Sequence, residues 1–257
     1  TTQLVADAHN TPTKMNRIYT TFTIGLLLIL VTPIHSLRGV QQGKTPMSSL
    51  THSFEPVLSS EEKYLNMAEL LGACWDFSSV LRKIGQTTLA RDFESNIRKA
   101  EALYKSVPSN RRQSLESLLL LERESGIHGP NGQLQDYSAA TGLLWIRRYL
   151  EFHLDMYSAI LASRDPTDAA IDAYKTQIEP FHGWALRKLF TVRLSTMMPP
   201  RDELLAMLGN FKTQEFGKKE EQLVLKDIRS LVSTWQPIVT QWRTAYQDLD
   251  LEDTRRA

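Results

Sequence analysis

The chain has 257 residues, of which 42% are hydrophobic and 23% are charged, which is enough for one sizeable globular domain. Its 30 Lys and Arg side chains balance 29 Asp and Glu side chains, so the formal net charge is +1 and bulk attraction to nucleic acid is excluded. The single cysteine, Cys74, excludes an intrachain disulfide framework and a metal site built from several cysteines.

The first predicted segment, residues 1–35, is a leader. Its apolar run from Ile18 to Ile34 holds no charged residue and follows Lys14 and Arg17. A basic flank before an apolar centre is typical of a signal peptide for the secretory pathway or an organelle. The run is short for a membrane span, and a retained signal anchor and a non-native leader remain alternatives. We therefore expect a membrane trafficking route, with a cytosolic protein at membrane surfaces as the alternative localisation.

Residues 36–59 are rich in Ser, Gln, Gly, Pro and Thr without apolar periodicity, and we predict a flexible linker there. Helix signals dominate afterwards and strand signals are scarce, so residues 60–250 are predicted to form one all-α domain. Acidic residues in the first turn indicate a helix start at Ser60. Pro237 is predicted to break or kink the last helix. Further helices are predicted to begin at Asp165-Pro166 and to cover residues 87–107, 111–125, 138–163, 182–198, 201–208 and 220–248.

The helix predicted over residues 138–163 has apolar residues over most of its circumference. Its polar side chains form one narrow stripe, which contains Arg147 and Glu151, and Arg147 is expected to face solvent. A helix with so little polar surface is packed between neighbours, so this helix is predicted to be central. Trp235 and Trp242 are seven residues apart in the last helix, which predicts that both pack in the core.

A row of polar side chains follows the apolar face of the helix predicted over residues 87–107. On a helical wheel Asp92, Asn96 and Lys99 lie close together, while Glu94 falls on the far side, where solvent is expected. An acceptor, a mixed donor and acceptor and a cationic donor suit a ligand rich in hydroxyls and amides. From spacing alone, the plainer interpretation is a solvated charge pattern at a helix edge.

Three motifs in order resemble the glycolipid transfer protein family. They are Asp92-x3-Asn96-Ile97-x-Lys99, then Leu143-Leu144-Trp145-Ile146-Arg147-Arg148-Tyr149-Leu150-Glu151-Phe152, then Phe181-His182-Gly183-Trp184. The resemblance covers roughly residues 60–250 and implies an all-α, two-layer helical sandwich with an apolar lipid-binding tunnel. It also implies a protein without catalytic activity that binds a glycosphingolipid and carries it between membranes.

The resemblance implies a role for each residue of this chain that matches a functional position of the family. Asp92 would accept from the ceramide amide N–H and from headgroup hydroxyls, and His182 would donate to the amide carbonyl. Asn96 and Lys99 would bond the sugar hydroxyls, and Trp145 would stack under the first sugar ring. Each role is physically sensible, because an amide needs one acceptor and one donor and an indole suits the C–H face of a sugar.

A second branch of the family, which carries ceramide-1-phosphate, has a lysine at the position of Asn96 and arginines at those of Thr141 and Trp145. The uncharged side chains here favour a neutral sugar headgroup, since a phosphate needs cationic donors. Arg148 lies nearby, and the sequence leaves open whether it faces solvent or the headgroup. A ceramide-1-phosphate carrier and a membrane-tethered sphingolipid sensor or adaptor without transfer remain the alternatives.

The remaining candidate residues do not indicate catalysis or metal binding. The sequence has no Gly-x-Ser-x-Gly elbow and no pair of histidines four residues apart, so we expect neither a serine hydrolase nor a metal site, and no cofactor. Cys74 lies in an apolar stretch and is predicted to be a buried, inert thiol. Trp184 is either a core residue or an exposed aromatic residue that docks on a membrane surface. The resemblance favours docking, for which an indole has suitable amphipathic character. The expected partners are a glycosphingolipid and that surface, with no nucleic acid, and the protein is expected to be monomeric.

Overall fold

The structure is a computed structural model that describes residues 45–58 and 64–256, and the predicted leader lies outside the described residues. Within these two ranges the regular structure is helical, with only isolated β-bridges, so the predicted all-α class is confirmed. The α-helices are α1 (Pro46–Phe54), α2 (Met67–Lys83), α3 (Thr87–Ser106), α4 (Leu115–Glu124), α5 (Ala139–Leu161), α6 (Pro166–Gln177), α7 (Trp184–Met197), α8 (Arg201–Gly209) and α9 (Lys218–Asp248).

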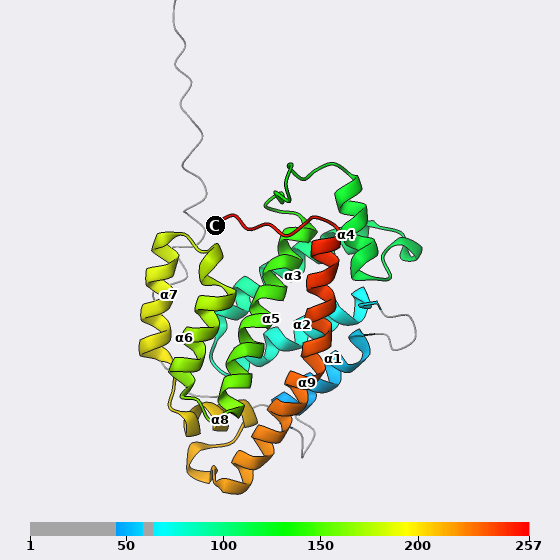
Figure 1. The fold of residues 1–257 in the computed structure, drawn as a ribbon. Helices are drawn as coiled ribbons and strands as arrows, with labels where there is room; N and C mark the ends of the chain where they lie inside the picture. The colour runs from blue at the N-terminus through cyan, green and yellow to red at the C-terminus, as the bar shows by residue number, and fades with distance from the viewer. Residues whose placement is uncertain (1–44, 59–63, 257) are drawn as a thin grey trace, which may run out of the picture. The chain divides into compact units, whose positions relative to one another are not determined.

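Helix α5 is the centre of the arrangement. It packs against α3, α6 and α9, while α2 packs on α3 and α1 packs on α2 and α9. In Figure 1, α6, α5 and α9 stand side by side in front of α2 and α3. The layers bury most of the side chains of α5, as the apolar circumference of this helix predicts.

Residues 45–58 form an ordered helical segment, so the prediction of a flexible linker is wrong for this part of the chain. Thr45 caps α1 by accepting a hydrogen bond from the Ser48 N–H at 3.0 Å. Its hydroxyl also donates to Asp227 of α9 at 2.6 Å. The buried face of the helix presents Met47, Leu50 and Phe54 to the core. Serines on the other face interrupt this short apolar pattern in the sequence.

Helix α2 begins at Met67, where Asn66 caps it, and the helix start predicted at Ser60 lies outside the described residues. The side chain of Asn66 accepts hydrogen bonds from the N–H groups of Ala68 and Glu69 at 3.0 and 3.2 Å. Such a cap satisfies donors that a helix start otherwise leaves without partners. The folded domain therefore contains α1 and is longer at its amino end than the sequence predicts.

The core is centred on aromatic side chains from α1, α2 and α9. Trp235 makes edge contacts with Phe54 and Phe77, with 5.3 Å between ring centroids in each pair. Trp235 and Trp242 are both fully buried, which confirms their predicted place in the core. Helix α9 continues without a break through Pro237, so the predicted break is wrong.

Two ionisable side chains, one of them against prediction, are buried as well. Glu94 is buried because α2 covers that side of α3, so its predicted exposure is wrong. It accepts hydrogen bonds at 2.7 Å from Arg82 and Ser78, and mainly the Arg82 guanidinium lowers the pKa of Glu94 to about 2. Cys74 is buried as predicted, and burial raises the pKa of its thiol, which keeps it protonated and inert.

Candidate functional site

The polar row of α3 is an interconnected set of side chains. Lys99 donates to the Asn96 side-chain oxygen at 3.0 Å, and the Asn96 amide donates to the Asp92 backbone oxygen at 3.3 Å. Asn96 is buried, while Asp92 and Lys99 are half-buried. Burial lowers the pKa of Lys99, and the nearby Asp92 carboxylate opposes this shift. The row therefore differs from a solvated charge pattern at a helix edge.

A glycine allows α5 to approach this row closely. An added Cβ at Gly142 would lie 2.5 Å from the backbone oxygen of Asn96 and 3.0 Å from the Cβ of Lys99. Separations below 3.0 Å are not tolerated between such atoms, so a larger residue forces the helices apart. Gly142 thus sets the spacing at which side chains of α5 reach the polar row.

Tyr149 of α5 joins the polar row to the predicted aromatic residue. Its hydroxyl donates a short hydrogen bond to the Asp92 carboxylate, and its ring centroid lies 6.4 Å from that of Trp145. Burial raises the pKa of Asp92, while the Tyr149 hydrogen bond and the charge of Lys99 act against this. Sequence reasoning missed Tyr149, although its place one helical turn after Trp145 was the available signal.

His182 completes the set from a third stretch of chain. It is buried and extended, directly after the 3-10 helix Glu179–Phe181 that contains Pro180, so the helix predicted from His182 begins only at Trp184. Its ring lies 5.8 Å from that of Trp145, and its Nδ1 is 3.1 Å from the Tyr174 hydroxyl. Burial, with a contribution from the Arg148 charge, lowers the pKa of His182 to about 4, so it is neutral at pH 7.

The structure therefore brings all five predicted headgroup residues into one neighbourhood. Asp92, Asn96 and Lys99 are linked along α3, Tyr149 connects Asp92 to Trp145, and Trp145 contacts His182. The set combines a carboxylate, an amide, an ammonium group, an imidazole and an indole. Such groups can hold a ligand that carries hydroxyls and an amide, without any covalent step.

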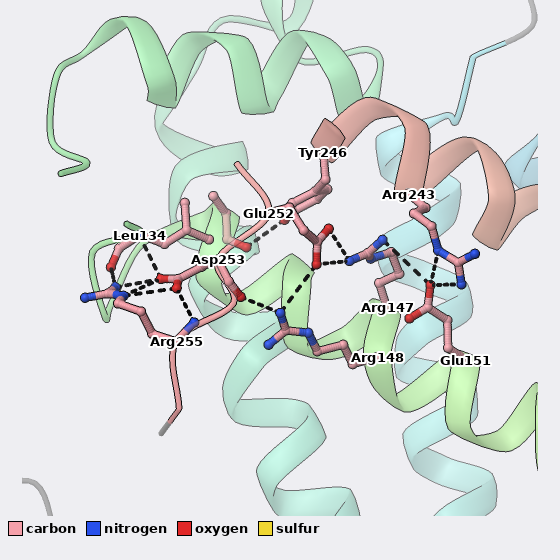
Figure 2. A network of polar contacts seen from close by, with 10 residues as sticks. Leu134, Arg147, Arg148, Glu151, Arg243, Tyr246, Glu252, Asp253 and Arg255 are labelled. Atoms are coloured by element: carbon pink, nitrogen blue, oxygen red, sulfur yellow. Dashed lines mark hydrogen bonds and ion pairs between the residues drawn. The ribbon is translucent and has the colours of Figure 1, made fainter. Parts of the chain in front are cut away.

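Two adjacent arginines of α5 lie close to the aromatic residues of the site. Arg147 and Arg148 are each only 2% exposed, so the predicted solvent exposure of Arg147 is wrong. The Arg148 guanidinium carbon lies 3.3 Å from the ring centroid of Phe181 and 5.3 Å from that of Trp145. Both arginines pair with Glu252, which belongs to residues 249–256, the segment that we call the C-terminal strap (Figure 2).

Trp184 is 68% exposed at the start of α7, which confirms its predicted exposure. The ammonium group of Lys188 lies 4.4 Å from the centroid of its ring. Val192 on the same helix is exposed too. A contact of this helix with a bilayer stays a prediction.

The apolar tunnel is predicted between the helix layers, and aromatic side chains pack closely where α2, α3 and α5 meet. Phe77 packs edge-on against Phe93 and His153, with ring centroids 5.2 and 5.0 Å apart. A pocket of about 300 Å³ lies elsewhere, beside Arg147, Arg148, Phe181 and Glu252. Another, of about 190 Å³, lies between α1 and α2. Neither pocket is the predicted tunnel.

The described residues give no indication of a metal site or a membrane span. Among them, no group of three or more His, Cys, Asp or Glu side chains is placed to hold a metal ion. None of the helices that the structure describes combines the length and apolarity that crossing a bilayer requires.

Comparison with known proteins decides the family. Residues 65–210 match the family model of the glycolipid transfer protein (GLTP). This chain belongs to the glycolipid transfer protein family. It is 26% identical over 205 residues to glycolipid transfer protein 3 of Arabidopsis thaliana, covering 76% of this chain and 82% of the relative. It is 28% identical over 196 residues to the glycolipid transfer protein of Xenopus tropicalis, covering 72% and 87% respectively.

A longer relative and two solved structures extend the comparison. Pleckstrin homology domain-containing family A member 8 of Danio rerio is 26% identical over 212 residues, which are 81% of this chain but 37% of the relative. A structure describing how FAPP2 selects simple glycosphingolipids with the GLTP fold has a TM-score of 0.71 at 22% identity, covering 83% of this chain and all of that one.

The apo form of mouse ceramide-1-phosphate transfer protein has a TM-score of 0.69 at 16% identity, covering 80% of this chain and 98% of that one. Likenesses at such identities show the fold. The protein therefore has the all-α GLTP fold, whose family binds and transfers lipids without enzymatic activity.

Proposed function

We propose that this protein binds glycosphingolipids and transfers them between membranes, with the headgroup held by Asp92, Asn96, Lys99, Trp145 and His182. The observation that supports this proposal most is the chain of contacts that joins these five residues through Tyr149, since they come from α3, α5 and the segment before α7. The names of relatives that contain "glycolipid transfer protein" support the same headgroup class.

The ceramide amide fits between Asp92 and His182. Burial raises the pKa of Tyr174 to about 12, so its hydroxyl keeps its proton. The hydroxyl lies 3.1 Å from Nδ1 of His182, and in the proposed arrangement it donates to that nitrogen. With Nδ1 accepting, Nε2 carries the imidazole proton and donates to the amide carbonyl. Asp92 accepts from the amide N–H, and the indole of Trp145 supports the sugar ring.

The charges around the site favour an uncharged sugar over a phosphate. Asn96 is neutral, and the Thr141 hydroxyl donates to the backbone oxygen of Gln135 at 2.8 Å. Arg147 and Arg148 are paired with the C-terminal strap. A ceramide-1-phosphate carrier is the second candidate, because a structure of such a protein shares this fold and two buried arginines lie beside the site.

Transfer between vesicles tests the proposal. We expect the purified full chain to move fluorescent glucosylceramide or galactosylceramide between phosphatidylcholine vesicles faster than ceramide-1-phosphate with the same acyl chain. Asp92→Val should abolish transfer, because the amide N–H and the hydroxyls lose their acceptor. Faster movement of ceramide-1-phosphate would favour the second candidate, and movement of neither lipid would contradict lipid transfer.

The ceramide chains of the bound lipid pass into the interior between α2, α3 and α5, where apolar side chains separate to admit them.

We infer a membrane trafficking route from the leader at residues 1–35, with a cytosolic protein at membrane surfaces as the alternative. A leader that stays attached would favour a tethered sensor or adaptor over a shuttle. Sequencing of the mature amino terminus from the source organism distinguishes a cleaved leader from a retained one.

A further inference from the structure

A cluster of opposite charges lies where α5, α9 and the C-terminal strap meet (Figure 2). Glu252 accepts a hydrogen bond from Arg147 at 2.7 Å and lies 3.4 Å from Nη2 of Arg148. Glu151 accepts from Arg243 at 2.8 Å and is 3.7 Å from Arg147. Three arginines thus face two glutamates in this cluster, and loss of the Glu252 charge would leave one glutamate against three arginines.

The charge of Arg148 is close enough to act on the headgroup site. Its guanidinium packs on Phe181 and lies 5.3 Å from the ring of Trp145. It also contributes to the low pKa of His182, which places its electrostatic influence on a headgroup residue. Because Arg148 is buried, water screens this charge weakly.

The C-terminal strap holds Glu252 in position through contacts on its far side. The carboxylate of Asp253 accepts from the Leu134 N–H at 2.9 Å, and Arg255 donates to the Leu134 oxygen at 2.8 Å. The backbone oxygen of Asp253 accepts a short hydrogen bond from Arg148. The carboxylate of Glu252 is therefore a fixed counterion for the two arginines of α5 (Figure 2).

We propose that Glu252 is a specificity-determining residue, whose carboxylate offsets part of the positive charge of Arg147 and Arg148 and so biases the headgroup site toward uncharged sugars and against phosphate or sulfate. This inference rests on the proposed function. Solved structures with the same fold are described with simple glycosphingolipids and with ceramide-1-phosphate, so the fold itself admits both kinds of headgroup. A counterion within the protein gives a preference between these headgroups that the fold alone does not give.

The central test replaces the carboxylate by an amide of the same shape. Glu252→Gln should raise the ratio of ceramide-1-phosphate transfer to glucosylceramide transfer by about tenfold, because Arg147 and Arg148 then lose an acidic counterion and attract a phosphate more strongly. Both lipids carry the same acyl chain and the vesicles are phosphatidylcholine. Asp250→Asn is the matched control, because Asp250 is exposed on the same strap and its positive φ of 53° suits asparagine.

A second pair of variants covers the case in which Glu252→Gln does not fold, since an uncompensated buried arginine destabilises a protein. Gln247 is exposed on α9 and lines the same pocket as Arg147 and Arg148. Gln247→Glu adds a carboxylate there and should lower the transfer ratio below that of the wild type. In the double variant Glu252→Gln/Gln247→Glu the ratio should return toward the wild-type value.

The outcomes separate this inference from the proposed function. If the wild type transfers glucosylceramide but neither Glu252→Gln nor Gln247→Glu changes the ratio, the role of Glu252 is wrong and glycolipid transfer stands. An equal change in Asp250→Asn would also overturn it, since the effect would then follow net charge. If the wild type transfers neither lipid, the proposed function fails first.

Discussion

At the scale of single residues, substitution of Trp145 distinguishes a role in ligand binding from a role in core packing. It is half-buried, and its ring lies near those of Tyr149 and His182 and near the guanidinium group of Arg148. Trp145→Ala should weaken glycolipid binding by about 1–3 kcal/mol, because the sugar loses its aromatic platform. Binding is measured by titration with glucosylceramide, and Trp145→Phe, which keeps a ring, should lose less. A large fall in the melting temperature of Trp145→Ala would instead identify a core residue.

The histidines make stability depend on pH. His182 and His153 are buried, and burial lowers the pKa of each from 6.5 to about 4. Between these pH values the unfolded chain binds protons that the folded chain does not, so the free energy of unfolding should fall as the pH decreases from 6.5 to 4. Urea denaturation at pH 7, 6 and 5 measures this fall.

The raised pKa of Asp92 opposes this fall in the free energy of unfolding at the acidic end of the range. The test therefore compares the pH dependence of variants with that of the wild type. His182→Gln should show a shallower decrease of stability than the wild type. The same change at His52, which is exposed on α1, should leave the decrease in place. An unchanged slope in His182→Gln would show that this imidazole does not titrate as the structure implies.

At the scale of helices, the spacing between α3 and α5 controls the site. Gly142→Ala should destabilise the domain by about 1–3 kcal/mol, because the added methyl group meets the backbone of Asn96. It should also weaken glycolipid binding, since Asn96 and Lys99 move relative to Trp145. Gly72→Ala in α2 is the matched control, because a Cβ there has nothing within 4 Å. That control should be neutral or stabilising by up to about 1 kcal/mol, so an equal loss in both variants would contradict the close-approach argument.

Helix α1 is part of the folded domain and should contribute strongly to stability. Phe54→Ala removes a fully buried ring that packs on Trp235, and it should lower the free energy of unfolding by about 3–5 kcal/mol. Ser49→Ala on the exposed face of the same helix should change it little. Equilibrium denaturation compares the two variants. A small effect of Phe54→Ala would mean that α1 is only loosely attached.

From the sequence, the helices that contain the motifs are predicted more accurately than the contacts that those helices make with other parts of the chain. The spacing of Asp92, Asn96 and Lys99 and the apolar circumference of α5 are local patterns, and both are present in the structure. Two errors have one physical cause, because Glu94 and Arg147 look solvent-facing on a helical wheel until a distant partner covers them. Arg82 lies 12 residues before Glu94, and Glu252 lies 105 residues after Arg147. No local pattern identifies either contact.

At the scale of the whole molecule, transfer requires contact with a membrane. Trp184 is the most exposed tryptophan side chain among the described residues, and Lys188 beside it suits the headgroup region of a bilayer. Trp184→Ala should lower vesicle binding and the transfer rate about tenfold or more, while the affinity for a short-chain, water-soluble glycolipid stays unchanged. Vesicle flotation measures the first effect. Leu223→Ala, an exposed apolar residue on α9, is the control.

The outcome of that experiment locates the docking surface. A reduction of transfer in both variants to the same extent would show that general surface apolarity, and not Trp184, governs docking. Loss of soluble glycolipid binding in Trp184→Ala would place this residue in the headgroup site.

The burial of Cys74 has a practical consequence for following the protein at a bilayer. The chain contains one cysteine, and its thiol is enclosed by the core. A cysteine introduced at Val192, which is 59% exposed on α7, would therefore be the single position that a maleimide dye can label. Energy transfer from that dye to a lipid-anchored acceptor would report the orientation of the bound protein without removal of any native thiol.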